Sequence, residues 1–115
     1  MGFVVAAAQR VAETVVAAEA ALVDREARWP ASGLKELQRE LGGLVVEERF
    51  GGMGHGLAAV ARVGEIVGRH CASTSICFGM HLTASAVLGA KATPAQQERY
   101  LRPIAAGEHL TTLAL

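Results

Sequence analysis

The sequence predicts an all-α domain that ends in one β-strand, and three observations lead to this prediction. The hydrophobic fraction is 51% while aromatic residues are only 4%, so the core has to consist of Ala, Val and Leu, which suits close-packed helices. Apolar residues recur at helical spacings of three and four through most of the chain. The stretch Ala72–Ala90 contains no Lys, Arg, Asp or Glu, so a helix there must be buried in protein or in lipid. The 115 residues are enough for one small domain.

The first two helices are predicted from stripes of apolar residues. The first stripe predicts a helix from about Phe3 to Leu22 and consists of Val4, Ala8, Val11, Val15, Ala18 and Leu22. A charge-rich, aperiodic segment, 23–29, follows it. Pro30 then opens a second helix, because proline suits the first helical turn. The stripe of this helix is Leu34, Leu37 and Leu41, and we expect Gly42-Gly43 to end it in a left-handed conformation.

A glycine-rich segment, Glu47–Gly56, follows a short apolar connection. Its four glycines within six positions predict a turn that residues with side chains could not follow. A phosphate-binding loop is the functional alternative. However, the spacing of Gly52, Gly54 and Gly56 matches neither the dinucleotide nor the Walker pattern, and no convincing strand precedes it. A structural turn is therefore the favoured interpretation.

Helical periodicity resumes over Leu57–Cys71 and leads into the uncharged stretch Ala72–Ala90. This stretch reaches the lower length limit of a membrane span. Its hydroxyl groups are scattered along the helix, however, and the flanking helices are amphipathic, which favours a helix buried in protein. His81 could act as a general base, but a hydrogen-bonded core histidine is favoured, since no acid lies nearby in sequence.

The C-terminal part combines a specific helix start with a predicted strand. Thr93-Pro94-Ala95-Gln96 has the pattern of a capping box with proline at the first helical position, and Gly107 ends the helical region. Leu110–Leu115 is rich in β-formers and predicts a strand. We expect a helical domain over 1–109 and the first strand of a truncated β-domain over 110–115. A single strand needs a neighbour, which is supplied either by another chain or, in the interpretation we favour, by a longer protein.

Charge and cysteine usage restrict the class of protein. Eleven basic and eleven acidic side chains give zero net charge, which argues against nucleic-acid binding. Cys71 and Cys77 lack zinc-site spacing and are interpreted as small buried hydrophobes in a reducing compartment. The N-terminus has no positive leader before its short apolar run. We therefore expect a cytoplasmic protein without a membrane span.

Several motifs in this order resemble the N-terminal helical domain of the acyl-CoA dehydrogenases. The pieces cover about three-quarters of the chain and are Trp29-Pro30, Glu40-Leu41-Gly42-Gly43-Leu44, Val46-Glu47-Glu48-Arg49-Phe50-Gly51-Gly52-Met53-Gly54, Gly79-Met80-His81, Gln96-Gln97-Glu98-Arg99-Tyr100-Leu101 and Ala106-Gly107-Glu108. The final Leu113-Ala114-Leu115 falls where that family continues into a Thr/Ser-Glu-Pro flavin motif. Val46 departs from the proline that is usual in the family, which removes a rigid turn element but no chemistry.

The resemblance implies an FAD-dependent enzyme that removes two hydrogens across the α- and β-carbons of an acyl-CoA thioester. It also implies a homo-oligomer that passes electrons to an electron-transfer flavoprotein or another acceptor. By position, Ser75, Gly79 and Thr83 would line the acyl pocket, and Leu113 and Leu115 would contact the flavin edge. The catalytic glutamate of the family lies beyond the matching region, so none of the acids in this sequence takes that role. We expect residues 1–115 alone to bind no FAD and to be inactive.

Two other classes remain open at this stage. One is a non-catalytic helical module of the same fold that binds a partner or an acyl ligand. The other is a structural helical domain that pairs through its terminal strand. The resemblance itself does not separate a dehydrogenase from an oxidase or a flavin monooxygenase of the same fold, and it does not specify the acyl chain.

Overall fold

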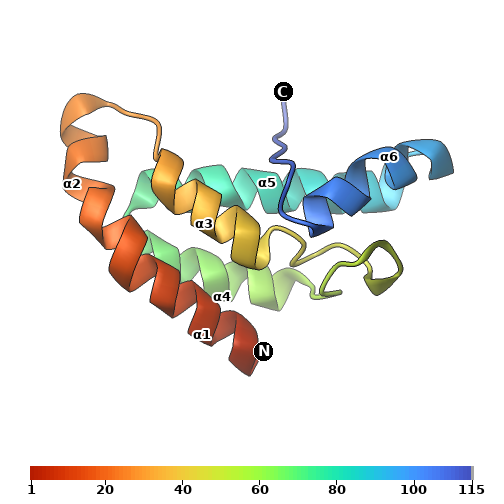
Figure 1. Ribbon diagram of the computed structural model, residues 1–115, viewed down its shortest axis with the longest axis horizontal. Coiled ribbons are helices and arrows are strands. Elements are labelled where there is room, and N and C mark those ends of the chain that lie inside the picture. Colours follow the sequence, from red (N-terminus) through yellow and green to blue (C-terminus); the bar gives the residue numbers. More distant parts are fainter. Residues whose placement is uncertain (115) are drawn as a thin grey trace.

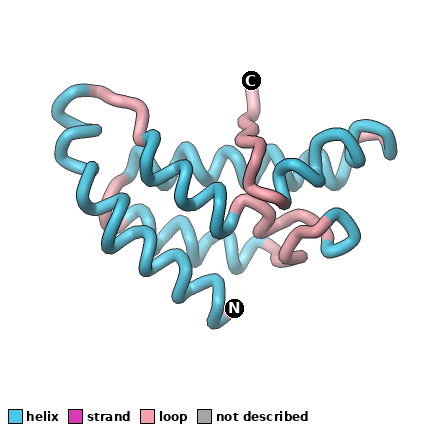
Figure 2. Tube along the Cα trace, in the orientation of Figure 1, coloured by secondary structure: helices cyan, strands magenta, loops and turns pink. Residues whose placement is uncertain are grey.

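The longest helix, α5 (Ala72–Lys91), packs against α3 (Ala31–Leu41), α4 (Leu57–Gly68) and α6 (Pro94–Ala105) in the computed structural model, which describes residues 1–114 (Figure 1). α4 lies antiparallel beside α5 and also packs on α1 (Gly2–Val11). α3 contacts both α1 and α5. α6 packs on α5 near its C-terminal end. The described residues contain helices and loops without a strand (Figure 2), which confirms the all-α class.

The N-terminal helix contains a π-helical segment, Ala12–Val16, between α1 and α2 (Ala17–Glu26). A π-turn holds one residue more than an α-turn, so it rotates everything that follows by about one position. The predicted stripe is therefore correct up to Val11 and wrong beyond it, because Val16 and Val23 are buried where Val15 and Leu22 were expected. The helix also continues past the predicted end at Leu22 to Glu26.

α3 carries the predicted stripe, since Leu34, Leu37 and Leu41 are all buried. Its predicted left-handed end is wrong, because Gly42 has right-handed helical angles (φ −57°, ψ −33°). The glycine pair instead allows the end of α3 and the end of α6 to lie close together. A Cβ atom on Gly43 would lie 2.9 Å from the Cα atom of Ala105 in α6. The glycines thus bring the end of α3 against α6.

Two apolar cores hold the helices together. The larger core contains residues from each of the helices α1, α2, α3, α4 and α5. Phe78 and Leu82 of α5 are fully buried in it. The smaller core lies under α6 and consists of Val46, Phe50, Leu101 and Ile104. Phe50 belongs to a short 3₁₀-helix, Glu48–Phe50, that precedes the glycine-rich turn.

The limits of α5 agree with the uncharged stretch to within one residue, whereas α4 ends at Gly68, before the predicted Cys71. The capping box of α6 is confirmed, since the Thr93 hydroxyl accepts from the Gln96 N–H and the Gln96 side chain accepts from the Thr93 N–H. Among the described residues, no helix combines the length and the apolar character that crossing a membrane requires.

The strand predicted over 110–115 does not form within residues 110–114, and its pairing with a further β-domain stays a prediction. Residues 110–114 form irregular chain rather than a strand, because the described part of the chain has no second strand with which to pair. One backbone donor of this segment finds another partner: the Thr111 N–H donates to Nδ1 of His81 at 3.0 Å. Leu115, the last residue of the predicted strand, lies outside the described residues.

Candidate functional site

The residues predicted to form a pocket wall lie along α5 where it faces α4. Ser75 and Gly79 border a gap of about 10 Å³ between the two helices. The Ser75 hydroxyl donates to the carbonyl oxygen of Gly64 at 2.9 Å, so this side chain is used in helix packing. A gap of this size holds about one water molecule. Ser75 therefore joins α4 to α5 in this structure and does not face an open cavity.

Gly79 is not required for close packing of α4 against α5. A Cβ atom built on Gly79 would meet no neighbouring atom within 4 Å. By contrast, a Cβ atom on Gly68 of α4 would lie 3.4 Å from the Ser75 hydroxyl oxygen. The Gly68 position thus lies in contact with α5, whereas Gly79 leaves space at the middle of α5.

Thr83 lies one turn further along α5 and borders a wider groove of about 450 Å³. Its side chain is exposed, and its hydroxyl donates back to the Gly79 carbonyl oxygen at 2.9 Å. Val60 and Leu82 line both this groove and the narrow gap. The three predicted wall residues thus follow one line along the α4–α5 junction, but they do not enclose one cavity.

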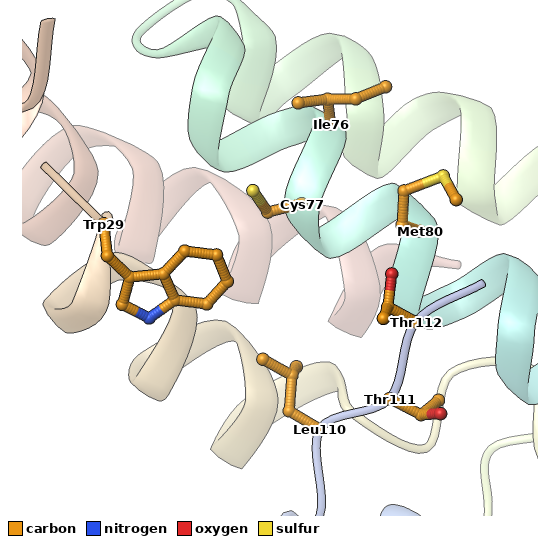
Figure 3. A pocket seen from close by; sticks show the side chains of 7 residues that line it. All are labelled: Trp29, Ile76, Cys77, Met80, Leu110, Thr111 and Thr112. Carbon is orange, nitrogen blue, oxygen red and sulfur yellow. The ribbon is translucent and has the colours of Figure 1, made fainter. Parts of the chain in front are cut away.

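A second groove, on another side of α5, was not predicted from the sequence. It has a volume of about 310 Å³, and we refer to it as the Trp29 groove after the indole at its edge; it is lined by Trp29, Ile76, Cys77, Met80, Leu110, Thr111 and Thr112 (Figure 3). The lining residues come from the α2–α3 connection, from α5 and from the segment that follows α6 (residues 106–114), which we call the C-terminal segment. Periodicity could not predict this groove, because only the tertiary fold brings these segments together.

The chemistry of the Trp29 groove is apolar. Ile76 is 64% exposed there, and the side chains of Cys77 and Met80 add sulfur atoms. Burial raises the pKa of the Cys77 thiol, and the nearby Cys71 raises it further, so the thiol form prevails near neutral pH. Cys71 and Cys77 are both free, and Cys71 is buried as expected. The groove suits apolar contact and offers no activated nucleophile.

His81 is the hydrogen-bonded core histidine that was favoured over a general base. Its ring is fully buried and stacks on Phe78, with 5.6 Å between the ring centroids. Nε2 lies 2.9 Å from the Gly42 carbonyl oxygen, and Nδ1 accepts from the Thr111 N–H. Burial lowers the pKa of His81, the bond to Gly42 opposes this shift, and His109 adds to it. Both ring nitrogens are occupied by the protein itself.

The glycine-rich segment is a structural turn, as the sequence predicted. Gly51 and Gly54 have positive φ angles of 89° and 67°. The N–H groups of Met53, Gly54 and His55 each donate to a backbone carbonyl oxygen at 2.9 Å. These donors are therefore not free to bind a phosphate, which excludes the phosphate-loop alternative for this part of the turn.

One of the two predicted flavin-contact residues, Leu113, lies within the described residues. Leu113 is half-buried at the end of the described segment and does not line either groove. Leu115 lies outside the described residues, so the structure does not place it.

Fold and site together define an all-α domain organised around one long helix, which carries no charged residue before its last, Lys91, and which borders two grooves. Residues 3–108 match the family model described as "Acyl-CoA dehydrogenase, N-terminal domain". The chain belongs to the acyl-CoA dehydrogenase family, of which it represents the N-terminal domain.

Curated relatives agree with this assignment. The chain is 38% identical over 88 residues to the mitochondrial very long-chain specific acyl-CoA dehydrogenase of Rattus norvegicus, and it is equally similar to that of Mus musculus. The match covers 72% of this chain and 12% of each enzyme. It is 32% identical over 111 residues to acryloyl-CoA reductase (NADH) of Anaerotignum propionicum, which covers 94% of this chain and 28% of the reductase. The chain thus spans a small part of the relatives that it matches.

Proposed function

We propose that this chain is the N-terminal portion of an FAD-dependent acyl-CoA dehydrogenase, which removes two hydrogens across the α- and β-carbons of an acyl-CoA thioester. Family membership and the relatives' names, which all refer to acyl-CoA compounds, support this proposal. Those names range from very long-chain acyl groups to the three-carbon acryloyl group. The class of substrate is therefore proposed, without a chain length.

The proposed role of the domain is to provide one wall of the acyl pocket through α5. The observation that carries this role is the open space at Gly79, where a Cβ atom would meet no neighbour within 4 Å. Glycine in a helix interior costs about 0.5–1 kcal/mol relative to alanine. Because packing does not require this glycine, a need for space beside the helix is a physical reason for it. Ser75 and Thr83, one turn to either side, belong to the proposed wall by their positions in the family resemblance; Thr83 borders the wider groove, whereas the Ser75 hydroxyl bonds to the Gly64 carbonyl oxygen in this structure.

FAD is the proposed cofactor of the complete enzyme, where it accepts the hydride that leaves the substrate. Leu113 could offer it an apolar edge contact, as could Leu115. The N–H groups of Met53, Gly54 and His55 in the glycine-rich turn already donate to backbone carbonyl oxygens, which supports a need for further parts of the enzyme to hold the cofactor. We therefore propose that residues 1–115 alone bind no FAD and catalyse no dehydrogenation.

The remaining proposals concern partners and location. The complete enzyme would be a homo-oligomer that passes electrons to an electron-transfer flavoprotein or another acceptor. Location in the cytoplasm is also proposed, from cysteine usage, although the rat and mouse relatives are named as mitochondrial. The alternative function is a non-catalytic helical binding or oligomerisation module. The exposed apolar side chains of Ile76 and Val87 on α5 favour it as second candidate.

A chain-length profile tests the proposed wall. Gly79→Leu in a protein that carries this domain together with its catalytic domains should lower kcat/KM for long acyl-CoA substrates more than for short ones. Ala72→Leu is the matched control, since Ala72 is exposed at the start of the same helix and lines neither groove. An unchanged profile in the Gly79 variant would contradict the wall. Turnover or a flavin absorbance band with residues 1–115 alone would contradict the proposed inactivity.

A further inference from the structure

The C-terminal segment forms part of the Trp29 groove, yet it belongs to no helix or strand. Leu110, Thr111 and Thr112 supply this part of the groove lining, opposite α5 (Figure 3). Without a ladder of backbone hydrogen bonds, the position of such a segment depends on a few individual contacts. The N–H of Thr111 donates to Nδ1 of His81, which joins the groove wall directly to α5.

The two partners of His81 determine where its proton lies. A backbone N–H can only donate, so Nδ1 must carry a lone pair to accept from Thr111. A carbonyl oxygen can only accept, so Nε2 must carry the proton that is donated to Gly42. Both bonds form together only in the neutral ring with its proton on Nε2. A proton added at Nδ1 would face the Thr111 N–H and abolish that bond.

We propose that His81 is a positioning residue for the Trp29 groove: its neutral Nε2–H form holds residues 110–112 against α5, and protonation at Nδ1 releases them and opens the groove wall. This inference is independent of the proposed dehydrogenase function. It concerns a bond between two residues of this chain and requires neither substrate nor cofactor.

The surroundings of His81 favour the neutral form. α3 presents the Gly42 carbonyl oxygen, α5 presents the Phe78 ring, and the C-terminal segment presents the Thr111 N–H. His109, on the same C-terminal segment, is the titratable group that acts on His81, and its positive form disfavours a second charge. Release therefore requires a pH below the ordinary range of histidine.

Nuclear magnetic resonance of the 115-residue chain tests the inference without any substitution. Long-range ¹H–¹⁵N correlations should show the His81 proton on Nε2. The exchange protection factor of the Thr111 amide should then fall as His81 is protonated, by about tenfold for each pH unit below its pKa. Protection of the Val63 amide, in the middle of α4, is the internal control and should not follow His81. A proton on Nδ1 in the neutral ring, or Thr111 protection that ignores the titration of His81, would overturn the inference.

A matched pair of variants separates the bond to Thr111 from the bond to Gly42. His81→Asn and His81→Leu both remove the donor to Gly42, but the asparagine Oδ1 lies where Nδ1 was and still accepts from Thr111. The Thr111 amide should stay protected at every pH in the asparagine variant and at none in the leucine variant. Equal protection in the two variants would contradict the role of Nδ1.

Trp29 reports on the groove itself, because it is the only tryptophan of the chain. Its fluorescence emission should shift to longer wavelength in step with the loss of Thr111 protection, as the opposite wall moves away and water enters. An emission spectrum that stays constant while Thr111 protection is lost would show that the groove does not depend on His81.

Discussion

The Glu19 side chain of α2 accepts a 2.8 Å hydrogen bond from the backbone N–H of Gly33 in the first turn of α3. The residue at the N-cap of α3 is Pro30, which provides no capping side chain. The carboxylate of Glu19, fourteen positions before Gly33, therefore caps the N-terminus of α3 and joins α2 to α3. Negative charge at a helix N-terminus also interacts favourably with the helix dipole.

Removing this cap should lower the stability of the domain. Glu19→Ala is expected to reduce the free energy of unfolding by about 1 kcal/mol, the usual value of a helix cap. Glu19→Gln keeps the accepting oxygen and should lose less, which separates the hydrogen bond from the charge. Urea denaturation followed by circular dichroism measures both variants. Equal losses for alanine and glutamine would mean that the charge, and not the bond, stabilises α3.

Two glycines should respond to alanine in opposite directions. Gly79→Ala should raise the free energy of unfolding by about 0.5–1 kcal/mol, because the added methyl meets no neighbour and alanine favours the helix. Gly43→Ala should destabilise the domain, since its Cβ atom would lie 2.9 Å from the Ala105 Cα atom. Thermal or urea unfolding of the two variants checks the contrast. Destabilisation by Gly79→Ala would show that α5 has a close neighbour at this position.

The capping box of α6 predicts a specific dependence on the hydroxyl group of Thr93. Thr93→Ala should cost about 1 kcal/mol, because the N–H of Gln96 loses its acceptor. Thr93→Ser keeps the hydroxyl and should be nearly neutral. Denaturation midpoints of the two variants provide the measurement. If serine were as destabilising as alanine, the threonine methyl group would be the important part.

The burial of His81 predicts how stability depends on pH. Its pKa is lower in the folded chain than the ordinary 6.5, so the unfolded chain binds more protons as pH falls below that value. The contribution of His81 to stability is therefore complete above pH 6.5 and is lost as pH decreases toward the folded pKa. Urea unfolding from pH 8 to pH 5 should show this decline. His81→Asn lacks the titrating ring and should show a smaller slope; an unchanged slope would assign the effect to other groups.

Local signals in the sequence were sufficient for most helices. The uncharged stretch located α5, Thr93 and Gln96 located the start of α6, and the leucine stripe located the buried face of α3. In each case residues within about one helical turn determine the structure, through propensity, capping or amphipathic burial. The motifs that resemble the acyl-CoA dehydrogenases were also local, and the family match over residues 3–108 confirmed them.

The structure differs from the sequence-based predictions in features that no short spacing of residue types encodes. A π-helical segment shifts the buried face from Leu22 to Val23. The strand predicted over 110–115 does not form in residues 110–114, where the described chain offers no neighbour for it, and its pairing within a longer protein stays a prediction. Gly42 was assigned a left-handed conformation, whereas the neighbouring Gly43 is needed for contact with α6.

The sequence alone thus determined the helices and the family, because both depend on residue types at short spacing. The tertiary structure alone decided which surfaces of α5 are open. It placed Ser75 against the Gly64 carbonyl oxygen, left Gly79 without a neighbour, and brought Trp29 and Thr111 to one groove. Such relationships depend on packing between segments far apart in the chain, and no spacing within one segment encodes them.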